Sequence, residues 1–237
     1  MAKKLSVIIP AFNEEKTIQT ILEKVNSVIL IGGFSMEIIV VNDFSTDTTE
    51  KKVKEFIAQN KNSEVKLFNQ PINRGKGAAI HRGIEEADGD YIVVQDADNE
   101  YNPDEFNKLL QPVVDGFADV VFGSRFMGGE PHRILFFWHS VGNKLLTTLS
   151  NMFTNLNLTD METCYKVFRR QVLDGRPLRA ERYGFDPEIT ARFCQAGARI
   201  YEVPISYSGR SYAEGKKITW KDGLVVLWTL IRCRLGG

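Results

Sequence analysis

The chain has 237 residues, of which 43% are hydrophobic and 25% charged, so it is long enough to bury one sizeable core. Its 30 Lys and Arg residues balance 30 Asp and Glu residues, and this zero formal net charge gives no global field that would favour nucleic acid as a partner. The three cysteines (Cys164, Cys194 and Cys233) are far apart and fit neither a disulfide framework nor a zinc site, which indicates a reducing compartment.

The first half of the chain alternates strand-like and helix-like segments. Met1-Ala-Lys-Lys leads straight into the first of them, so we expect no signal peptide. Apolar runs predict buried strands at Leu5–Pro10, Glu37–Val41 and Val65–Phe68. Apolar residues at helical spacing predict helices over 17–28, from Thr48 onward and over 78–84. Units of roughly 25 to 30 residues predict a mostly parallel, doubly wound α/β sheet.

A fourth strand-like run, Tyr91–Val94, leads into a cluster of acidic residues. Alternate residues of an extended chain point the same way, so Asp96, Asp98 and Glu100 could converge just past the end of this strand. Three hard oxygen donors at that spacing suit Mg²⁺ or Mn²⁺ bridging substrate phosphates. An acidic turn that only solvates the strand end is the alternative interpretation.

Other polar segments also follow predicted strands. Pro10–Glu14 ends the first strand, Asp43 follows the second, and the acidic cluster 96–100 follows the fourth. Ligands of parallel α/β sheets bind beyond the carboxyl ends of the strands. We therefore expect these three segments to share one site.

The second half of the chain is more helical. Asp119–Phe122 predicts a strand that runs into Gly123-Ser124-Arg125, and Tyr165–Phe168 predicts an edge strand. A helix is expected over 188–196 and a strand over 199–204. No stretch reaches the roughly 18 uninterrupted apolar residues that span a bilayer. We therefore expect a protein that is soluble or at most peripheral to a membrane.

Two helix-like segments of this half have apolar faces. Apolar residues recur at three- and four-residue steps over 133–156, which fits either a core-packed helix or a helix partly exposed to lipid. The tail, 212–237, is basic and interleaves two tryptophans with aliphatic residues. It fits an interfacial helix, a helix packed on its own domain, or a dimer face.

Five motifs occur in register along residues 5 to about 217. They are Ser6-Val-Ile-Ile-Pro-Ala-Phe-Asn-Glu14, Val41-Asn-Asp43-Phe-Ser-Thr-Asp47, Asn73-Arg-Gly-Lys-Gly77, Gln95-Asp-Ala-Asp98 and Gly123-Ser-Arg125. Together they resemble the family-2 glycosyltransferases of GT-A fold, and within them the polyprenyl-phosphate group that includes the dolichol-phosphate mannose synthases. One Asp-x-Asp alone would be weakly specific.

The resemblance implies a fold, a reaction and a location. It implies a GT-A domain over 1–211 with an amphipathic helical insertion at 133–158, followed by a basic amphipathic segment at 212–237. The implied reaction is the metal-dependent transfer of a hexose, with inversion, from a nucleotide-diphosphate sugar to a polyprenyl phosphate. Mg²⁺ or Mn²⁺ is the implied cofactor. The implied place is the cytoplasmic face of a membrane, with peripheral association and no nucleic-acid partner.

The resemblance also implies roles for individual residues. Asp96, Asp98 and Arg125 are the expected catalytic residues, and Asp98 and Glu100 the expected metal ligands. The expected ligands of the acceptor phosphate are Arg125, Arg133, Ser140 and Asn143. The expected ligands of the nucleotide-sugar are Pro10, Ala11, Asn13, Glu14, Asp43, Lys76, Asp96, Ala97, Asp98, Arg210 and Lys216.

Several of these positions have structural alternatives or depart from the family pattern. Pro10 could simply terminate a strand, Asn13 and Glu14 could lie in a helix N-cap region, and Arg125 could form a surface ion pair. Relatives often have Gln where this chain has Glu100. The family's basic motif near the end matches only at its outer cations, Arg210 and Lys216.

Two other functions remain open from the sequence. A sugar or glycan hydroxyl as acceptor would need a general base, whereas an acceptor phosphate is already anionic and needs none. A nucleotide-sugar-binding protein without transfer activity is the second alternative. The candidate bases for a hydroxyl acceptor are Asp160, Glu162, Asp186 and Glu188.

Overall fold

A seven-stranded sheet organises the parts of the chain that the computed structural model describes, residues 3–131, 133–134, 137–182, 184–209 and 220–234. The strand order is β3-β2-β1-β4-β6-β5-β7, and only β6 runs antiparallel to its neighbours in these residues. This confirms the prediction of a mostly parallel α/β sheet. The strands are β1 (Lys4–Ala11), β2 (Ser35–Asn42), β3 (Val65–Asn69), β4 (Tyr91–Val94), β5 (Val120–Ser124), β6 (Lys166–Arg169) and β7 (Ile200–Pro204).

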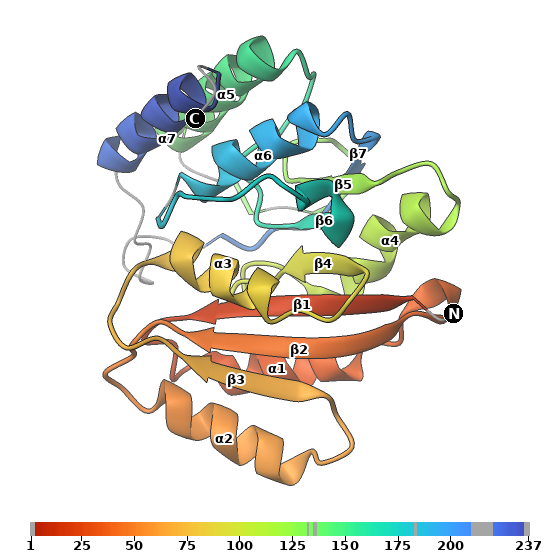
Figure 1. Ribbon diagram of the computed structural model, residues 1–237, viewed down its shortest axis with the longest axis vertical. Coiled ribbons are helices and arrows are strands. Elements are labelled where there is room, and N and C mark those ends of the chain that lie inside the picture. The colour runs from red at the N-terminus through yellow and green to blue at the C-terminus, as the bar shows by residue number, and fades with distance from the viewer. Residues whose placement is uncertain (1–2, 132, 135–136, 183, 210–219, 235–237) are drawn as a thin grey trace.

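Helices cover both faces of the sheet. In Figure 1, α3 lies on the near face and α1 on the far face, and α5 and α7 lie side by side at the opposite end of the molecule from α2. Three short 3₁₀ turns, η1 (Ile31–Gly33), η2 (Pro103–Glu105) and η3 (Arg170–Leu173), complete the described elements. The helices are α1 (Ile18–Ser27), α2 (Thr49–Gln59), α3 (Lys76–Glu85), α4 (Phe106–Val114), α5 (Phe137–Thr154), α6 (Phe185–Gln195) and α7 (Trp220–Arg234).

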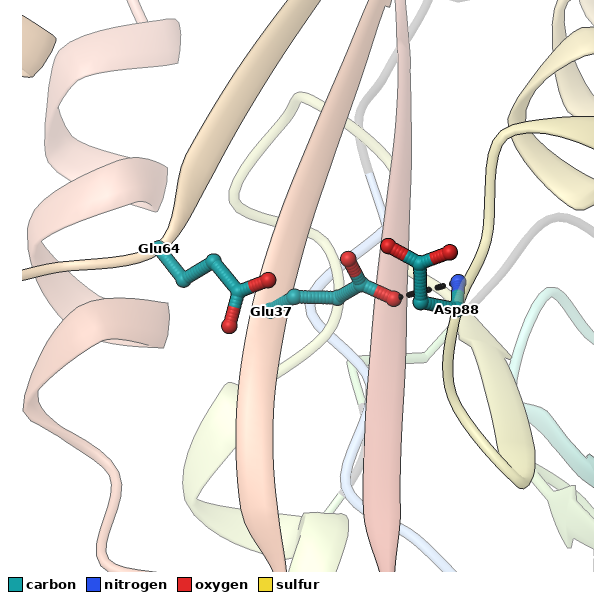
Figure 2. Close-up of side chains that lie close together, drawn as sticks. All are labelled: Glu37, Glu64 and Asp88. Atoms are coloured by element: carbon teal, nitrogen blue, oxygen red, sulfur yellow. Dashed lines mark hydrogen bonds between the residues drawn. The ribbon is translucent and has the colours of Figure 1, made fainter.

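A network of ion pairs closes the amino-terminal edge of the sheet. Glu37, Glu64 and Asp88 bring their carboxylates together there, as Figure 2 shows. Lys66 Nζ lies 2.8 Å from Glu37 and 2.6 Å from Asp88, while Lys4 Nζ lies 2.6 Å from Glu64. Each of the three carboxylates thus lies within 2.8 Å of an ammonium group, and the two ammonium groups offset two of the three negative charges. We assign this cluster to the fold and not to a metal.

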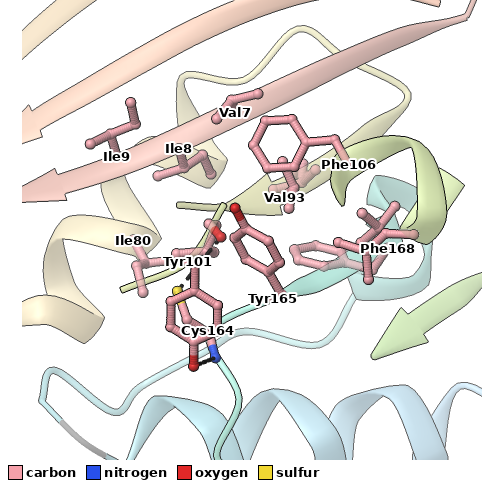
Figure 3. Close-up of a cluster of buried hydrophobic side chains, with 14 of the residues drawn as sticks. Val7, Ile8, Ile9, Ile80, Val93, Tyr101, Phe106, Cys164, Tyr165 and Phe168 are labelled. Carbon is pink, nitrogen blue, oxygen red and sulfur yellow. Dashed lines mark hydrogen bonds between the residues drawn. The ribbon is translucent and has the colours of Figure 1, made fainter. Parts of the chain in front are cut away.

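Buried side chains of β1, β4 and β6 pack together in the core, with Ile80 of α3 and Phe106 of α4 in the same cluster (Figure 3). The rings of Tyr101 and Tyr165 pack against each other within it, with centroids 4.8 Å apart and planes tilted by 35°. Both phenols are hydrogen-bonded, since the Cys164 amide donates to Tyr101 Oη at 3.1 Å and Tyr165 Oη donates to Gln95 Oε1 at 2.6 Å. Gln95 directly follows β4 and Tyr101 directly follows the acidic cluster, and both are bonded to the segment that leads into β6. The core therefore holds the residues on either side of the cluster.

The position of β6 corrects one prediction. The run Tyr165–Phe168 was expected to be an edge strand, but β6 pairs with β4 on one side and β5 on the other. Lys166 is a charged residue in this interior strand and is only 1% exposed. Its ammonium group is 2.5 Å from Asp186 Oδ1 on α6, and this partner makes burial of the charge tolerable.

Within the described ranges, none of the helices combines the length and the apolar character that crossing a bilayer requires.

Candidate active site

All seven described strands have one end at the same edge of the sheet. Six of them, β1, β2, β3, β4, β5 and β7, end at this carboxyl edge, and β6 begins there because it runs the other way. The structure therefore brings the segments after β1, β2 and β4 to the same edge, as their spacing predicted. The first of them differs slightly from expectation, since β1 continues through Pro10 to Ala11, opposite Asn42. Pro10 lies beyond the stretch of β1 that pairs with β4, where its missing N–H is not needed.

The segments after β1 and β2 are hydrogen-bonded to each other. Asn13, in the left-handed region with φ 53°, donates its amide to Ser45 Oγ at 3.0 Å and accepts from the Thr46 amide at 2.8 Å. The Glu14 amide donates to Thr49 Oγ1 at 2.9 Å. The N-cap residue of α1 is Thr17, so Asn13 and Glu14 precede the helix and are not its caps.

Asp43 fixes the loop that leads into α3. Its carboxylate is 3% exposed and accepts from the backbone amides of Arg74 at 2.9 Å and Gly75 at 2.7 Å. Gln70 Nε2 donates to the same carboxylate at 3.2 Å. Asp43 thereby determines where Lys76, the first residue of α3, enters the site.

Lys76 pairs with the first carboxylate after β4. Its Nζ lies 2.6 Å from Asp96 Oδ1. Burial opposes the charged form of Lys76, but Asp96 raises the pKa of its ammonium group well above the ordinary value. The start of α3 is also packed tightly, because a Cβ on Gly77 would clash with the carbonyl oxygen of Ala180.

The three carboxylates after β4 do not converge on one point. Asp96, Asp98 and Glu100 do not bring a ligand atom each within 4.8 Å of one another, and Asp96 is paired with Lys76. Asp98 is 7% exposed and accepts from the Glu100 amide at 3.1 Å. Glu100 accepts from Tyr207 Oη at 2.6 Å. Hard carboxylate oxygens two residues apart at a strand end fit Mg²⁺ or Mn²⁺ as donors. Ala97, which lies between Asp96 and Asp98 in the sequence, belongs to the core.

Arg125, at the end of β5, forms a bidentate pair with Asp160. Nε and Nη2 of Arg125 lie 2.6 and 2.8 Å from the two carboxylate oxygens, and Asp160 is fully buried. Burial opposes ionisation of this carboxyl, but Arg125 lowers the pKa of Asp160 overall. Asn143 on α5 joins the pair, accepting from Arg125 Nη2 at 3.3 Å and donating to Asp160 at 3.3 Å. The pair is thus internal and not on the surface.

The other expected ligands of the acceptor phosphate are in α5 and in the segment that precedes it. Ser140 is on α5, one helical turn before Asn143, and is partly buried. Arg133 donates to the carbonyl oxygen of Gly209 at 2.9 Å. Arg210 and Lys216, the expected cations for the diphosphate, lie outside the described residues.

The four candidate bases have different surroundings. Asp160 and Asp186 each face a cation, Arg125 and Lys166 respectively. Glu188 is fully buried, and its carboxylate accepts two backbone amides of residues 179 and 180 and lies 2.9 Å from an Arg232 nitrogen of α7.

Glu162 differs from the other three. Its Oε1 is enclosed and has no hydrogen-bond partner among the described residues. Burial, and then the nearby Asp186 carboxylate, raise the pKa of Glu162 to about 8.

Apolar side chains form an exposed stripe on α5. Phe137 and Trp138 open the helix, with Trp138 78% exposed, and Val141, Leu145 and Met152 continue the stripe at three-, four- and seven-residue steps. On α7, which packs against α5, Trp228 is also exposed. The sequence predicted the apolar periodicity but left open whether it faces the core or the outside. The structure shows that this part of it faces outwards.

The sequence of the chain is similar to those of known proteins. The profile of glycosyl transferase family 2 matches residues 6–176. The dolichol-phosphate mannosyltransferase of Pyrococcus furiosus is 28% identical over 220 residues, covering 90% of this chain and 59% of that protein. A low-salt glycan biosynthesis hexosyltransferase of Haloferax volcanii is 32% identical over 239 residues, covering 99% of this chain and 54% of that protein. The chain thus spans between half and two thirds of the length of these relatives.

Solved structures show the same fold. A glucosyl-3-phosphoglycerate synthase of Mycobacterium tuberculosis, crystallised with UDP, superposes with a TM-score of 0.71 at 20% identity, covering 98% of this chain and 80% of that chain. The same synthase has been crystallised with Mn²⁺, UDP and phosphoglyceric acid, and that structure superposes with a TM-score of 0.72.

Proposed function

The chain belongs to glycosyl transferase family 2 and has its GT-A fold, and on this premise we propose that it transfers a hexose, with inversion, from a nucleotide-diphosphate sugar to a polyprenyl phosphate. The observation that carries the proposal is the contact between Arg125 and Asn143. It joins a guanidinium group suited to phosphate directly to α5, whose exposed face is apolar. A phosphate head beside an apolar surface is the chemistry of a lipid phosphate.

The segments at the carboxyl edge of the sheet would bind the nucleotide-sugar donor. Asp43 and the loop it holds would bind the nucleotide, together with the segment Pro10–Glu14. Asp98 and Glu100 would hold Mg²⁺ or Mn²⁺, and the bound cation would neutralise charge on the departing nucleoside diphosphate. The relatives and the synthase support this role, since their names include a polyprenyl-type phosphate acceptor, UDP and Mn²⁺.

The place of the reaction follows from the acceptor. We infer peripheral binding at the cytoplasmic face of a membrane through the apolar stripe of α5 and the exposed Trp228 of α7. An interfacial helix buries its apolar face at the boundary of headgroups and acyl chains. The three free cysteines fit the reducing cytoplasmic side.

A panel of nucleotide-sugars tests the proposal. The purified protein would be incubated with UDP- or GDP-hexoses, farnesyl phosphate and Mg²⁺ or Mn²⁺, and extracted lipid would be analysed for attached sugar. We expect lipid-linked sugar with one donor, and its loss when the cation is chelated. Release of free sugar, or extension of a glycan without any lipid product, would refute the proposed acceptor.

A further inference from the structure

We propose that Glu162 binds the acceptor phosphate as a neutral carboxylic acid, donating its hydroxyl hydrogen to a phosphate oxygen. This inference rests on the proposed function, because it concerns the acceptor side of the same site. It adds a specificity-determining residue whose proton state decides whether an anionic acceptor can bind.

The charges around Glu162 are already paired. On one side Arg125 makes its bidentate contact with Asp160, and on the other Lys166 lies 2.5 Å from Asp186. Among the described residues that act electrostatically on Glu162, each cation therefore has its own carboxylate. An ionised Glu162 would leave this group with a net negative charge, and a phosphate dianion would be repelled.

The surroundings of the Glu162 carboxyl group also favour its neutral form. Glu162 Oε1 is enclosed, yet it has no hydrogen-bond partner among the described residues. An enclosed ionised oxygen without a donor is costly, whereas a carboxylic acid in the same place is far less so. A neutral acid whose hydrogen is on the other carboxyl oxygen, Oε2, also offers what a phosphate oxygen needs, since it is an O–H donor and carries no opposing charge.

The titration of Glu162 supports this assignment. Burial and the Asp186 carboxylate raise the pKa of Glu162 to about 8, against the weaker opposing effects of Lys166 and Arg125. Most molecules therefore hold the proton at neutral pH. Acceptor affinity should be full below about pH 8 and fall by about tenfold for each further pH unit as Glu162 ionises.

Two substitutions separate this role from that of a general base. Glu162→Gln keeps the shape and provides a permanently neutral donor, whereas Glu162→Ala removes the donor. We expect Glu162→Ala to raise the KM for farnesyl phosphate by roughly 10- to 100-fold at pH 7, with a smaller effect on kcat. Glu162→Gln should recover much of that loss, and its acceptor KM should lack the rise above pH 8 that the wild type shows.

Calorimetry gives a readout that does not depend on turnover. Binding of farnesyl phosphate at pH 8.5 in two buffers of different ionisation enthalpy should show proton uptake by the wild type and none by Glu162→Gln. An inactive but folded Glu162→Gln enzyme would overturn the proposal, because it would mean that turnover needs the ionised carboxylate of Glu162. An unchanged alkaline rise of KM in Glu162→Gln would also overturn it. If the wild type transfers no sugar to farnesyl phosphate, the proposed function itself fails.

Discussion

The three carboxylates that follow β4 differ in their partners, and this separates their roles. Asp96 is held by the ammonium group of Lys76, whereas Asp98 contacts the Glu100 amide and Glu100 contacts Tyr207. Asp98 and Glu100 carry hard carboxylate oxygens two residues apart, the kind of donor that suits a divalent cation bridging two phosphates. We propose that the metal role depends most on Asp98, the first of the two.

Replacement of Asp98 by Ala should lower kcat by at least about a hundredfold while leaving the fold intact. It removes a hard oxygen ligand of the cation that would neutralise the charge on the leaving nucleoside diphosphate in the transition state. Turnover with saturating Mn²⁺ and the thermal unfolding midpoint would be measured together. Asp104→Ala is a suitable control, since Asp104 is an exposed carboxylate in the next turn and should not affect turnover. Near-normal turnover by a folded Asp98→Ala enzyme would contradict the metal role.

The strands and their order of succession were predictable because buried strands and amphipathic helices have distinct periodicities. The interior place of β6 was not, because Lys166 looks like an edge residue until its partner Asp186, 20 positions later, is known. The pairing of Arg125 with Asp160 escaped prediction for the same reason. Sequence periodicity reports which face of an element is apolar, but not which charges from distant segments will meet.

The tight packing at the start of α3 can be tested by substituting Gly77. Gly77→Ala should lower both the unfolding midpoint and the affinity for the donor, because the new methyl group displaces the backbone at Ala180 from the helix that carries Lys76. Calorimetric unfolding and nucleotide binding would measure the two effects. Gly142→Ala on α5 is the matched control, since a Cβ there has no neighbour within 4 Å and Ala favours a helix by about 1 kcal/mol. Equal effects of the two substitutions would contradict this packing argument.

The ion-pair network at the amino-terminal edge should act on stability and not on catalysis. Burial alone would raise the pKa of Glu37, but hydrogen bonds, chiefly from Lys66, lower it overall. A lowered folded-state pKa means that the stabilisation is complete above the unfolded value of about 4.5 and is lost as the pH falls through the folded value.

Glu37→Gln should therefore destabilise the fold by about 1.5–3 kcal/mol at pH 7 and lose less stability on acidification than the wild type. Denaturant unfolding at pH 7 and at pH 4 would measure this difference. Its kcat should match the wild type, because the residue lies at the edge of the sheet opposite the candidate site. A large loss of turnover at unchanged stability would show that this edge has a functional role.

The candidate site and the apolar surface lie next to each other. α5 contributes Asn143 to the Arg125–Asp160 pair and presents Trp138 outwards. α7 packs against both α5 and α6, so the outer helices form one assembly beside the carboxyl edge. A lipid acceptor could reach the site without its chain leaving the membrane boundary.

Introducing charge into the stripe should weaken membrane binding. The double substitution Phe137→Glu and Trp138→Glu is expected to reduce binding to vesicles containing anionic lipid by at least about tenfold, because two apolar contacts are replaced by repelled charges. Vesicle co-sedimentation would measure the effect. Ile29→Glu is the control, since Ile29 is 88% exposed at the opposite edge of the sheet. Equal binding by all three proteins would exclude the stripe as the membrane contact.

A comparison of farnesyl phosphate with farnesol tests the nature of the acceptor most directly. The two lipids share their chain, and they differ in whether the attacking oxygen is already anionic. With the donor found in the nucleotide-sugar panel, we predict labelled sugar in the lipid extract when farnesyl phosphate is supplied, and none with farnesol. Transfer to farnesol, or labelled product that stays in water with either lipid, would contradict a polyprenyl-phosphate acceptor.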